Sequence, residues 1–189
     1  MLKVYSGTIR SKTAGLSPYN DERIELFLAG CRMAREGHPC PGCFNSDLWY
    51  DDNCHEQTAE EIVSYIESMT DNKYITIVGG EPLDQAKELV LLLKTLQEKH
   101  FHVVLISHYR VDEILKMEYG KNILSYTNLL IDGRYEADKR IFETDTRPGI
   151  YHVVGSSNQR LWYNIGKGYI DITGQEDLRK FYTKRREDI

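Results

Sequence analysis

The sequence predicts an α/β protein in which parallel strands are joined by helical crossovers, either a doubly wound sheet or a barrel. Apolar, strand-like segments alternate with segments of helical periodicity from about residue 23 to residue 131, and such alternation implies a parallel sheet. The loops with unusual composition follow Ala29, Val78, Ile106 and Ile131. These positions are the carboxyl ends of predicted strands, where parallel α/β folds place their functional loops.

Each predicted element has a local signal in the sequence. The predicted strands are rich in β-branched and apolar residues and end in glycine or polar residues; they cover residues 23–29, 73–80, 102–107, 127–133, 149–155 and 168–173. The predicted helices repeat apolar residues at helical spacing; they cover residues 57–69, 83–100, 110–117 and 175–188. Thr58 and Glu61 form a capping box that begins the first helix. The turn-rich segment 6–22 predicts no regular element.

Length and composition limit the class of protein. The 189 residues suit one domain with its own core, and 28% charged with 41% hydrophobic residues is a soluble globular profile. A net charge of −5 argues against binding to nucleic acid or to an anionic membrane. We find no apolar run near the roughly 20 residues that cross a bilayer and no signal peptide. We therefore expect a cytoplasmic protein whose thiols stay reduced.

Three of the four cysteines lie within 13 residues, with the spacing C-x8-C-x2-C at Cys31, Cys40 and Cys43. Taken alone they leave three interpretations open: a zinc site completed by His38, an iron–sulfur cluster, or unliganded thiols. Iron–sulfur cubes usually have four thiolate ligands, so three would leave one iron with an open site for substrate chemistry. We expect Cys54 to be an ordinary residue of a polar turn.

The segment Gly-Gly-Glu-Pro at residues 79–82 ends the next predicted strand. Two glycines at a strand end leave backbone groups open to a closely approaching ligand. An ordinary tight turn before a helix explains this motif equally well by itself. Because a three-cysteine loop precedes it by one strand and one helix, the combination favours a site for a cluster and a cofactor.

With these two motifs the sequence resembles the radical S-adenosylmethionine (radical SAM) enzymes. It is more closely similar to the anaerobic ribonucleoside-triphosphate reductase activating proteins, through four further stretches. These are LFLAGC (26–31), CPGCFNSDLW (40–49), DGRYEADKR (132–140) and GSSNQR (155–160). The family's usual spacing is C-x3-C-x2-C, so residues 32–39 contain an insertion.

The resemblance covers about residues 24–160 of what we expect to be a single domain over 1–189, with an N-terminal segment (1–22) and a C-terminal extension (161–189). It implies a partial (β/α) barrel of the radical SAM type. In that fold we expect the strands to be parallel and the crossovers to be helical.

The resemblance also implies roles for individual residues. The implied ligands of a 4Fe-4S cluster with one open iron are Cys31, Cys40 and Cys43. The implied site for the methionine ammonium of S-adenosylmethionine is Gly79, Gly80 and Glu81. The residues implied at its carboxylate or ribose are Ser107, Asp132 and Arg134, although Arg134 also suits a surface salt bridge. The run SSNQ (156–159), from which Ser156 and Asn158 are the expected cofactor contacts, is expected either in the adenine pocket or in a slot for the partner's glycine loop.

No catalytic residue is implied beyond the ligands of the cluster and the cofactor. His108 follows Ser107 and would face the same pocket. A histidine at a strand end can act as an acid–base group, but hydrogen abstraction needs none. We therefore expect His108 to pack or to hydrogen-bond.

The implied activity is that of a radical SAM oxidoreductase. Reductive cleavage of S-adenosylmethionine would give a 5′-deoxyadenosyl radical, which generates a glycyl radical on anaerobic ribonucleotide reductase, with a flavodoxin or ferredoxin as electron donor. One alternative is a small-molecule enzyme resembling 7-carboxy-7-deazaguanine synthase, against which GSSNQR argues. Another is a zinc-stabilised interaction module, which would leave Gly-Gly-Glu-Pro unexplained.

Overall fold

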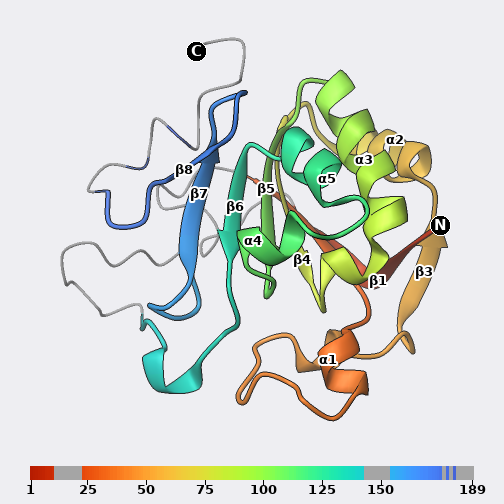
Figure 1. Ribbon diagram of the computed structural model, residues 1–189. Coiled ribbons are helices and arrows are strands. Elements are labelled where there is room, and N and C mark those ends of the chain that lie inside the picture. Colours follow the sequence, from red (N-terminus) through yellow and green to blue (C-terminus); the bar gives the residue numbers. More distant parts are fainter. Residues whose placement is uncertain (11–22, 143–153, 176–177, 179–180, 182–189) are drawn as a thin grey trace.

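The computed structural model describes residues 1–10, 23–142, 154–175, 178 and 181, with the backbone alone for residues 6–10. Its centre is an eight-stranded sheet in the order β3-β1-β2-β4-β5-β6-β7-β8 (Figure 1). The strands are β1 (Leu2–Arg10), β2 (Ile24–Leu28), β3 (Cys54–Gln57), β4 (Tyr74–Gly79), β5 (His102–Ser107), β6 (Leu129–Asp132), β7 (Arg160–Asn164) and β8 (Tyr169–Asp171). Strands β2, β4, β5 and β6 are parallel, whereas the outer pairings are antiparallel.

The longer helices cover one face of this sheet, and α1 lies apart from them near the carboxyl ends of the parallel strands (Figure 1). The α-helices are α1 (Arg32–Arg35), α2 (Ala59–Met69), α3 (Ala86–Glu98), α4 (Val111–Ile114) and α5 (Gly120–Tyr126). Short 3-10 helices are η1 (Ser46–Leu48), η2 (Pro82–Gln85) and η3 (Ala137–Lys139). Within the described residues, no helix has the length and apolar character needed to cross a membrane.

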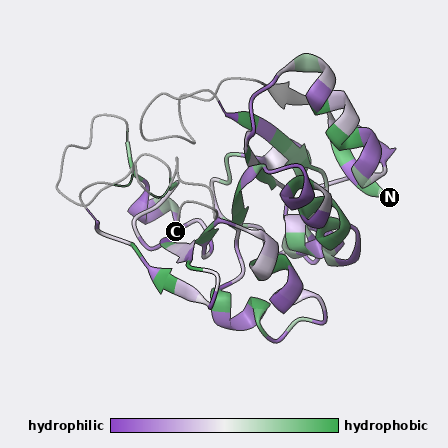
Figure 2. Cartoon of the chain, turned by 90° about the horizontal axis from the view of Figure 1, so that it is seen from above, coloured by the Kyte–Doolittle hydropathy of each residue, from purple (hydrophilic) through white to green (hydrophobic). Residues whose placement is uncertain are grey.

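Side chains alternate between the two faces of the central strands, and the two faces differ in what covers them. Ile77 of β4 and Leu105 of β5 belong to the core beneath the helices. Val104 and Ile131 belong to a second cluster that includes residues of β7. Figure 2 shows the hydrophobic residues concentrated on the strands, and hydrophilic residues on the outer sides of the helices. The face opposite the helices is therefore apolar as well, which makes it suitable for a cavity.

The prediction of parallel strands with helical crossovers is confirmed for the middle of the sheet. The barrel is not confirmed, because the described strands form one sheet with β3 and β8 at its edges. Helix α2 begins after Thr58, and both hydrogen bonds of the predicted capping box with Glu61 are present.

Other predictions differ from the structure or lie outside it. Cys54 belongs to strand β3 rather than to a turn, because residues 54–57 pair antiparallel with β1. Strands β1 and β7 and helix α5 had no counterpart in the prediction. Most of the predicted strand at 149–155 and of the predicted helix at 175–188 lies outside the described residues.

Candidate functional site

A cavity of about 730 Å³ opens at the carboxyl ends of the parallel strands and extends over the sheet face opposite the helices. Its apolar floor comes from four neighbouring strands: Phe27, Val78, Ile106 and Ile131. The cysteine loop lines the cavity as well. The predicted site residues that line it are Cys31, Cys40, Cys43, Gly79, Gly80, Glu81 and Ser107. The fold thus brings both leading sequence motifs to one cavity.

The three cysteines come from two parts of the loop: one precedes α1, and two lie in a tight turn. Cys31 comes immediately before α1, and its thiol is buried. Cys40 and Cys43 are partly exposed and are held together by a turn, in which the Cys43 N–H donates to the Cys40 carbonyl at 3.1 Å. Gly42, with φ of 69°, gives that turn a left-handed conformation that glycine adopts without strain.

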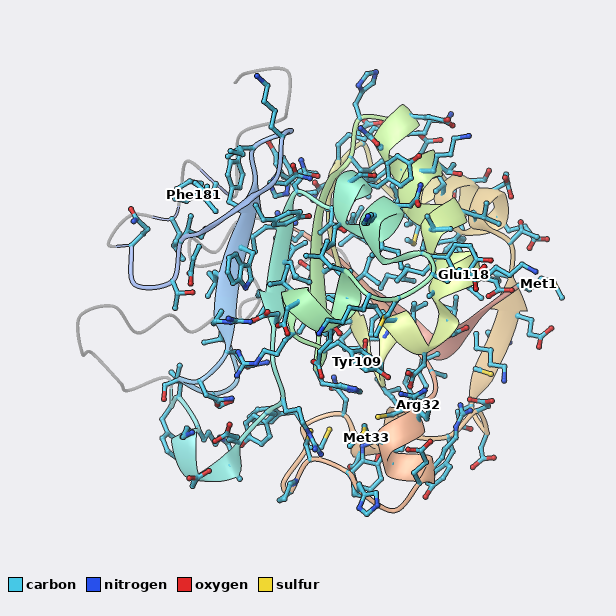
Figure 3. The ribbon with its side chains drawn as sticks, in the orientation of Figure 1. Met1, Arg32, Met33, Tyr109, Glu118 and Phe181 are labelled. Atoms are coloured by element: carbon cyan, nitrogen blue, oxygen red, sulfur yellow. The ribbon has the colours of Figure 1, made fainter. Side chains whose placement is uncertain are left out.

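The insertion at residues 32–39 is folded against the rest of the site. The Arg32 N–H donates to Asp84 Oδ2 at 2.5 Å, and the His38 carbonyl accepts from Arg134 Nη2 at 2.9 Å. The Arg32 guanidinium also donates to the Tyr109 hydroxyl at 3.0 Å, and Figure 3 shows these two side chains next to each other. The longer spacing therefore forms an anchored helical turn, and Cys31 and Cys40 still line one cavity.

The three cysteines differ in how well they suit a single metal ion and a cluster. In the described part of the chain, no three His, Cys, Asp or Glu side chains converge as a single metal ion would require. A 4Fe-4S cluster has a different requirement, because each cysteine binds a different iron. Three thiols spread around one cavity fit a cluster better than they fit a single zinc ion.

The double glycine brings the end of β4 against the end of β2. A Cβ atom at Gly79 would lie 2.0 Å from the Leu28 carbonyl oxygen, and one at Gly80 would lie 2.1 Å from the Gly30 carbonyl oxygen. Gly79 also has a φ of 143°, which other residues rarely adopt. The Glu81 N–H donates to the Gly30 carbonyl at 2.7 Å. Glycine at both positions thus places Glu81 beside the residue that precedes Cys31.

The buried carboxylate of Glu81, with 1% of its surface exposed, connects the ends of β4 and β5. Its Oε1 accepts from the Ser107 hydroxyl at 2.8 Å and from the Leu83 N–H at 3.0 Å. Its Oε2 accepts from the His108 N–H at 2.8 Å and lies 2.9 Å from His108 Nδ1. Both Glu81 and Ser107 therefore have protein partners, and contacts from them to a cofactor stay predictions.

His108 lines the cavity beside these two residues. Burial lowers the pKa of His108, but hydrogen bonding and charge interactions with Cys31 and with the Glu81 carboxylate outweigh burial and raise it to about 10. Its buried Nε2 has no partner with good hydrogen-bond geometry among the residues that the structure describes, although Cys31 is near enough to affect its pKa. The prediction that His108 forms hydrogen bonds is therefore met at Nδ1, which faces Glu81.

Asp132 is fully buried and is held by two arginines. Arg160 contacts both carboxylate oxygens, from Nε at 3.0 Å and from Nη2 at 2.7 Å. The Val111 N–H donates to Oδ2 at 2.7 Å, and Arg110 Nη1 lies 3.5 Å from Oδ1. Hydrogen bonding to Asp132 raises the pKa of Arg160. The Asp132 carboxylate thus links β6 to β7 and to the start of α4. Asp132 does not line the cavity, whereas the neighbouring Gly133 does.

The remaining predicted residues, Arg134, Ser156 and Asn158, do not line the cavity. Arg134 is exposed, and its carbonyl accepts from Asn158 Nδ2 at 2.8 Å. The buried Ser156 hydroxyl accepts from the Glu136 N–H at 3.1 Å. Gln159, from the same segment, lines the cavity. Cofactor contacts from Arg134, Ser156 and Asn158 stay predictions.

Sequence reasoning missed two residues that organise this site. Asn45 donates from Nδ2 to the Gly79 carbonyl at 3.0 Å and so links the cysteine loop to the double glycine. Arg160 pairs with Asp132. Both lie within stretches that carry the resemblance, but their partners depend on tertiary contacts. Gln159, which belongs to the predicted segment 156–159, donates from Nε2 to the Gly133 carbonyl at 2.9 Å.

The chain is similar to a known sequence family and to known proteins. The sequence model of the 4Fe-4S single cluster domain family matches residues 21–162. The anaerobic ribonucleoside-triphosphate reductase-activating protein of Pasteurella multocida (strain Pm70) is 27% identical over 128 residues, which are 62% of this chain and 76% of that protein. The crystal structure of QueE from Escherichia coli is similar with a TM-score of 0.44 and 17% identity, over 56% of this chain and 53% of that one. The family match spans the cysteine loop, the double glycine and segment 155–160.

Proposed function

The chain belongs to the 4Fe-4S single cluster domain family, and from this premise we propose that it is a radical SAM activating enzyme. Its proposed partner is anaerobic ribonucleoside-triphosphate reductase, on which it would generate a glycyl radical. The observation that carries the proposal is that three cysteine thiols and the double-glycine strand end line one cavity. Similarity to the reductase-activating protein of Pasteurella multocida supports the choice of partner.

The cofactors would supply the chemistry and the protein would supply position and shielding. When bound, a reduced 4Fe-4S cluster supplies the electron that breaks a C–S bond of S-adenosylmethionine, giving methionine and a 5′-deoxyadenosyl radical that takes a hydrogen atom from a glycine Cα. Cys31, Cys40 and Cys43 would each hold one iron and leave the last iron open to the cofactor. The electron would come from a flavodoxin or a ferredoxin.

The double glycine would receive the methionine ammonium through backbone oxygens. An ammonium group has three donors and needs converging acceptors, and Gly79 and Gly80 present backbone without side chains at the cavity. Glu81 would contribute mainly by holding the strand ends, because its two oxygens already face four protein groups. Of the other proposed contacts to the cofactor, Ser107 lines the cavity. Asp132, Arg134, Ser156 and Asn158 would reach the cofactor from outside the present lining.

The cavity has the size and the lining that this chemistry needs. Small-molecule sites have volumes of about 300–1,000 Å³, and the volume of about 730 Å³ falls in that range. Phe27, Val78 and Ile106 give the cavity an apolar floor. Such a floor excludes water, which protects a reactive intermediate from side reactions.

The experiment that tests this proposal is an anaerobic assay of 5′-deoxyadenosine. The protein is reconstituted with iron and sulfide, given dithionite and S-adenosylmethionine, and its products are separated by chromatography. Cys43→Ala is the test variant. Cys54→Ala is the matched control, since Cys54 lies on β3 and hydrogen-bonds the Asp51 carbonyl. We expect the nucleoside from the wild type and the control and none from Cys43→Ala.

The partner is tested in the same preparation. Adding the anaerobic reductase should give a glycyl radical signal in electron paramagnetic resonance (EPR) that requires both reductant and S-adenosylmethionine. A wild-type protein that holds a cluster and forms no nucleoside would contradict the radical chemistry. Nucleoside without a signal on the reductase would contradict the choice of partner alone.

A further inference from the structure

The backbone on both sides of Cys31 is held by the short segment that follows the double glycine. On one side, the Glu81 N–H donates to the Gly30 carbonyl at 2.7 Å. On the other side, the Arg32 N–H donates to Oδ2 of Asp84 at 2.5 Å. Because both neighbours of Cys31 are fixed to the same segment, the direction in which the Cys31 side chain points is restricted.

Asp84 acts as a helix cap that Cys31 does not provide. Helix α1 begins after Cys31, whose side chain makes no capping hydrogen bond within the described part of the chain. The first N–H groups of a helix have no partner inside it, and the side chain of the N-cap residue usually binds one of them. Here the Asp84 carboxylate binds the N–H of Arg32, the first residue of the helix. The Cys31 side chain lines the cavity instead.

Tyr109, which follows the end of β5, holds this contact in place. Its hydroxyl donates to Asp84 Oδ1 at 3.0 Å and accepts from Arg32 Nη2 at 3.0 Å. Its backbone N–H donates to the Ser107 hydroxyl at 3.0 Å. Asp84 is exposed, so these hydrogen bonds rather than burial determine where its carboxylate lies. Through Asp84 the beginning of the insertion is tied to the ends of both β4 and β5.

A lengthened cysteine loop makes such a contact important for binding a cluster. The insertion adds residues between two ligands, and each residue that becomes ordered on binding costs conformational entropy. Contacts that orient a ligand from behind typically change metal affinity 10–100-fold. On the basis of the proposed function, we propose that Asp84 is a positioning residue that orients Cys31 for the cluster by accepting the Arg32 N–H.

The test measures how fast a chelator of ferrous iron removes iron from the reconstituted, reduced protein. Asp84→Ala removes both acceptor oxygens, at an exposed position where the fold should tolerate the change. Asp84→Asn keeps an acceptor for the Arg32 N–H and turns its N–H₂ towards the Tyr109 hydroxyl, which can accept as well as donate. Thr58→Ala is the control, because it removes the cap of helix α2, away from the cysteine loop. Urea unfolding without the cluster gives the stability of each protein.

We expect Asp84→Ala to raise the rate of iron loss about 10–100-fold. Asp84→Asn should remain close to the wild type, and Thr58→Ala should lose iron at the wild-type rate. An unchanged rate in Asp84→Ala would overturn the proposal. An equal increase in Thr58→Ala would also overturn it, because iron loss would then follow stability alone. So would an equal increase in Asp84→Asn, because the hydrogen bond would then be irrelevant.

A second measurement needs neither a variant nor a cluster. Hydrogen exchange followed by nuclear magnetic resonance reports whether the Arg32 amide of the wild type is bound. The proposal predicts slower exchange than for the same amide in an unstructured peptide, and exchange at the peptide's rate would overturn it. A wild type that holds no cluster would contradict both this proposal and the proposed function, whereas a cluster that Asp84→Ala leaves unaffected would contradict this proposal alone.

Discussion

Two buried carboxylates lie at the same edge of the sheet and are held in different ways. Glu81, just after β4, faces the cavity and is held by a hydroxyl, two backbone N–H groups and His108. Asp132, at the end of β6, lies behind the cavity wall and is held by two arginines and one backbone N–H. Both are almost fully buried.

The difference shows that burial alone does not identify a carboxylate that serves a bound ligand. Asp132 pairs with Arg110, the N-cap residue of α4, and with Arg160 of β7, so these contacts stay within the fold. Glu81 instead holds His108, which lines the cavity. We infer that Asp132 mainly stabilises the fold and that Glu81 mainly organises the site.

The largest expected effect on stability is that of Asp132→Asn. The substitution removes the charge between two arginines and breaks the bidentate contact with Arg160. Breaking a buried ion pair costs several kcal/mol, less where the partner is partly exposed, so we expect a loss of about 2–4 kcal/mol. Urea unfolding measures it, with the exposed Asp138→Asn as control. A loss no larger than the control's would contradict the assigned role.

The substitution Glu81→Gln should lower the formation of 5′-deoxyadenosine more than it lowers the free energy of unfolding. One amide N–H₂ would face donors that now bind a carboxylate oxygen, at a cost of about 1–3 kcal/mol. Because the position of His108, which lines the cavity, depends on this carboxylate, we expect a roughly 10–100-fold loss of 5′-deoxyadenosine formation. The exposed Glu98→Gln is the control in both assays. If Glu81→Gln lost stability as Asp132→Asn does but kept its activity, the contrast between the two carboxylates would be wrong.

A third buried ionisable group, His102, lies at the opposite end of the strands, at the start of β5. It should make the stability of the fold depend on pH. Burial, reinforced by the Arg23 charge, lowers the pKa of His102 to about 3. The unfolded chain has a histidine pKa of about 6.5, so it binds the proton more readily, and folding stability falls as the pH falls from about 6.5 towards 3.

Between pH 7 and pH 5 this histidine should remove about 2 kcal/mol from the free energy of unfolding. Urea unfolding at both pH values measures the loss in the wild type and in His102→Gln. The variant should lose less than the wild type between the two pH values, whatever its stability at pH 7. Equal losses in the two proteins would show that His102 is not kept neutral by the fold.

The smallest expected effect lies on the helix-covered side, far from both carboxylates. Thr58→Ala removes the side-chain oxygen that accepts from the Glu61 N–H and should cost about 1 kcal/mol. Ser68→Ala, at the other end of α2, is the control. Formation of 5′-deoxyadenosine should not change, and a large loss of activity would mean that α2 is coupled to the cavity.

The central strands and the helices between them were predictable from sequence, because their apolar periodicity is local. Strand β3 was not, because Cys54–Gln57 is a polar edge strand whose existence depends on pairing with β1. Strand β1 and strand β7 likewise pair antiparallel with strands whose register the local sequence does not determine.

The candidate site also has parts that the sequence predicts and parts that it does not. The cysteine loop and the double glycine were predictable as neighbours, because the carboxyl ends of parallel strands share one edge. The partner of Asp132 was not, since Arg160 lies opposite it only through the register of β6 and β7. The network of Glu81 was not predictable either, because it depends on how closely the ends of β4 and β5 approach.

The central claim is that three cysteines of this cavity hold a 4Fe-4S cluster with an iron open to S-adenosylmethionine. Its most direct test is the EPR spectrum of the reconstituted, reduced protein with and without S-adenosylmethionine, in the wild type and in alanine variants of Cys31, Cys40, Cys43 and Cys54. We predict a cluster spectrum that changes on adding the cofactor, survives Cys54→Ala and is lost in the other three variants. A spectrum that S-adenosylmethionine leaves unchanged, or that depends on Cys54, would contradict the account.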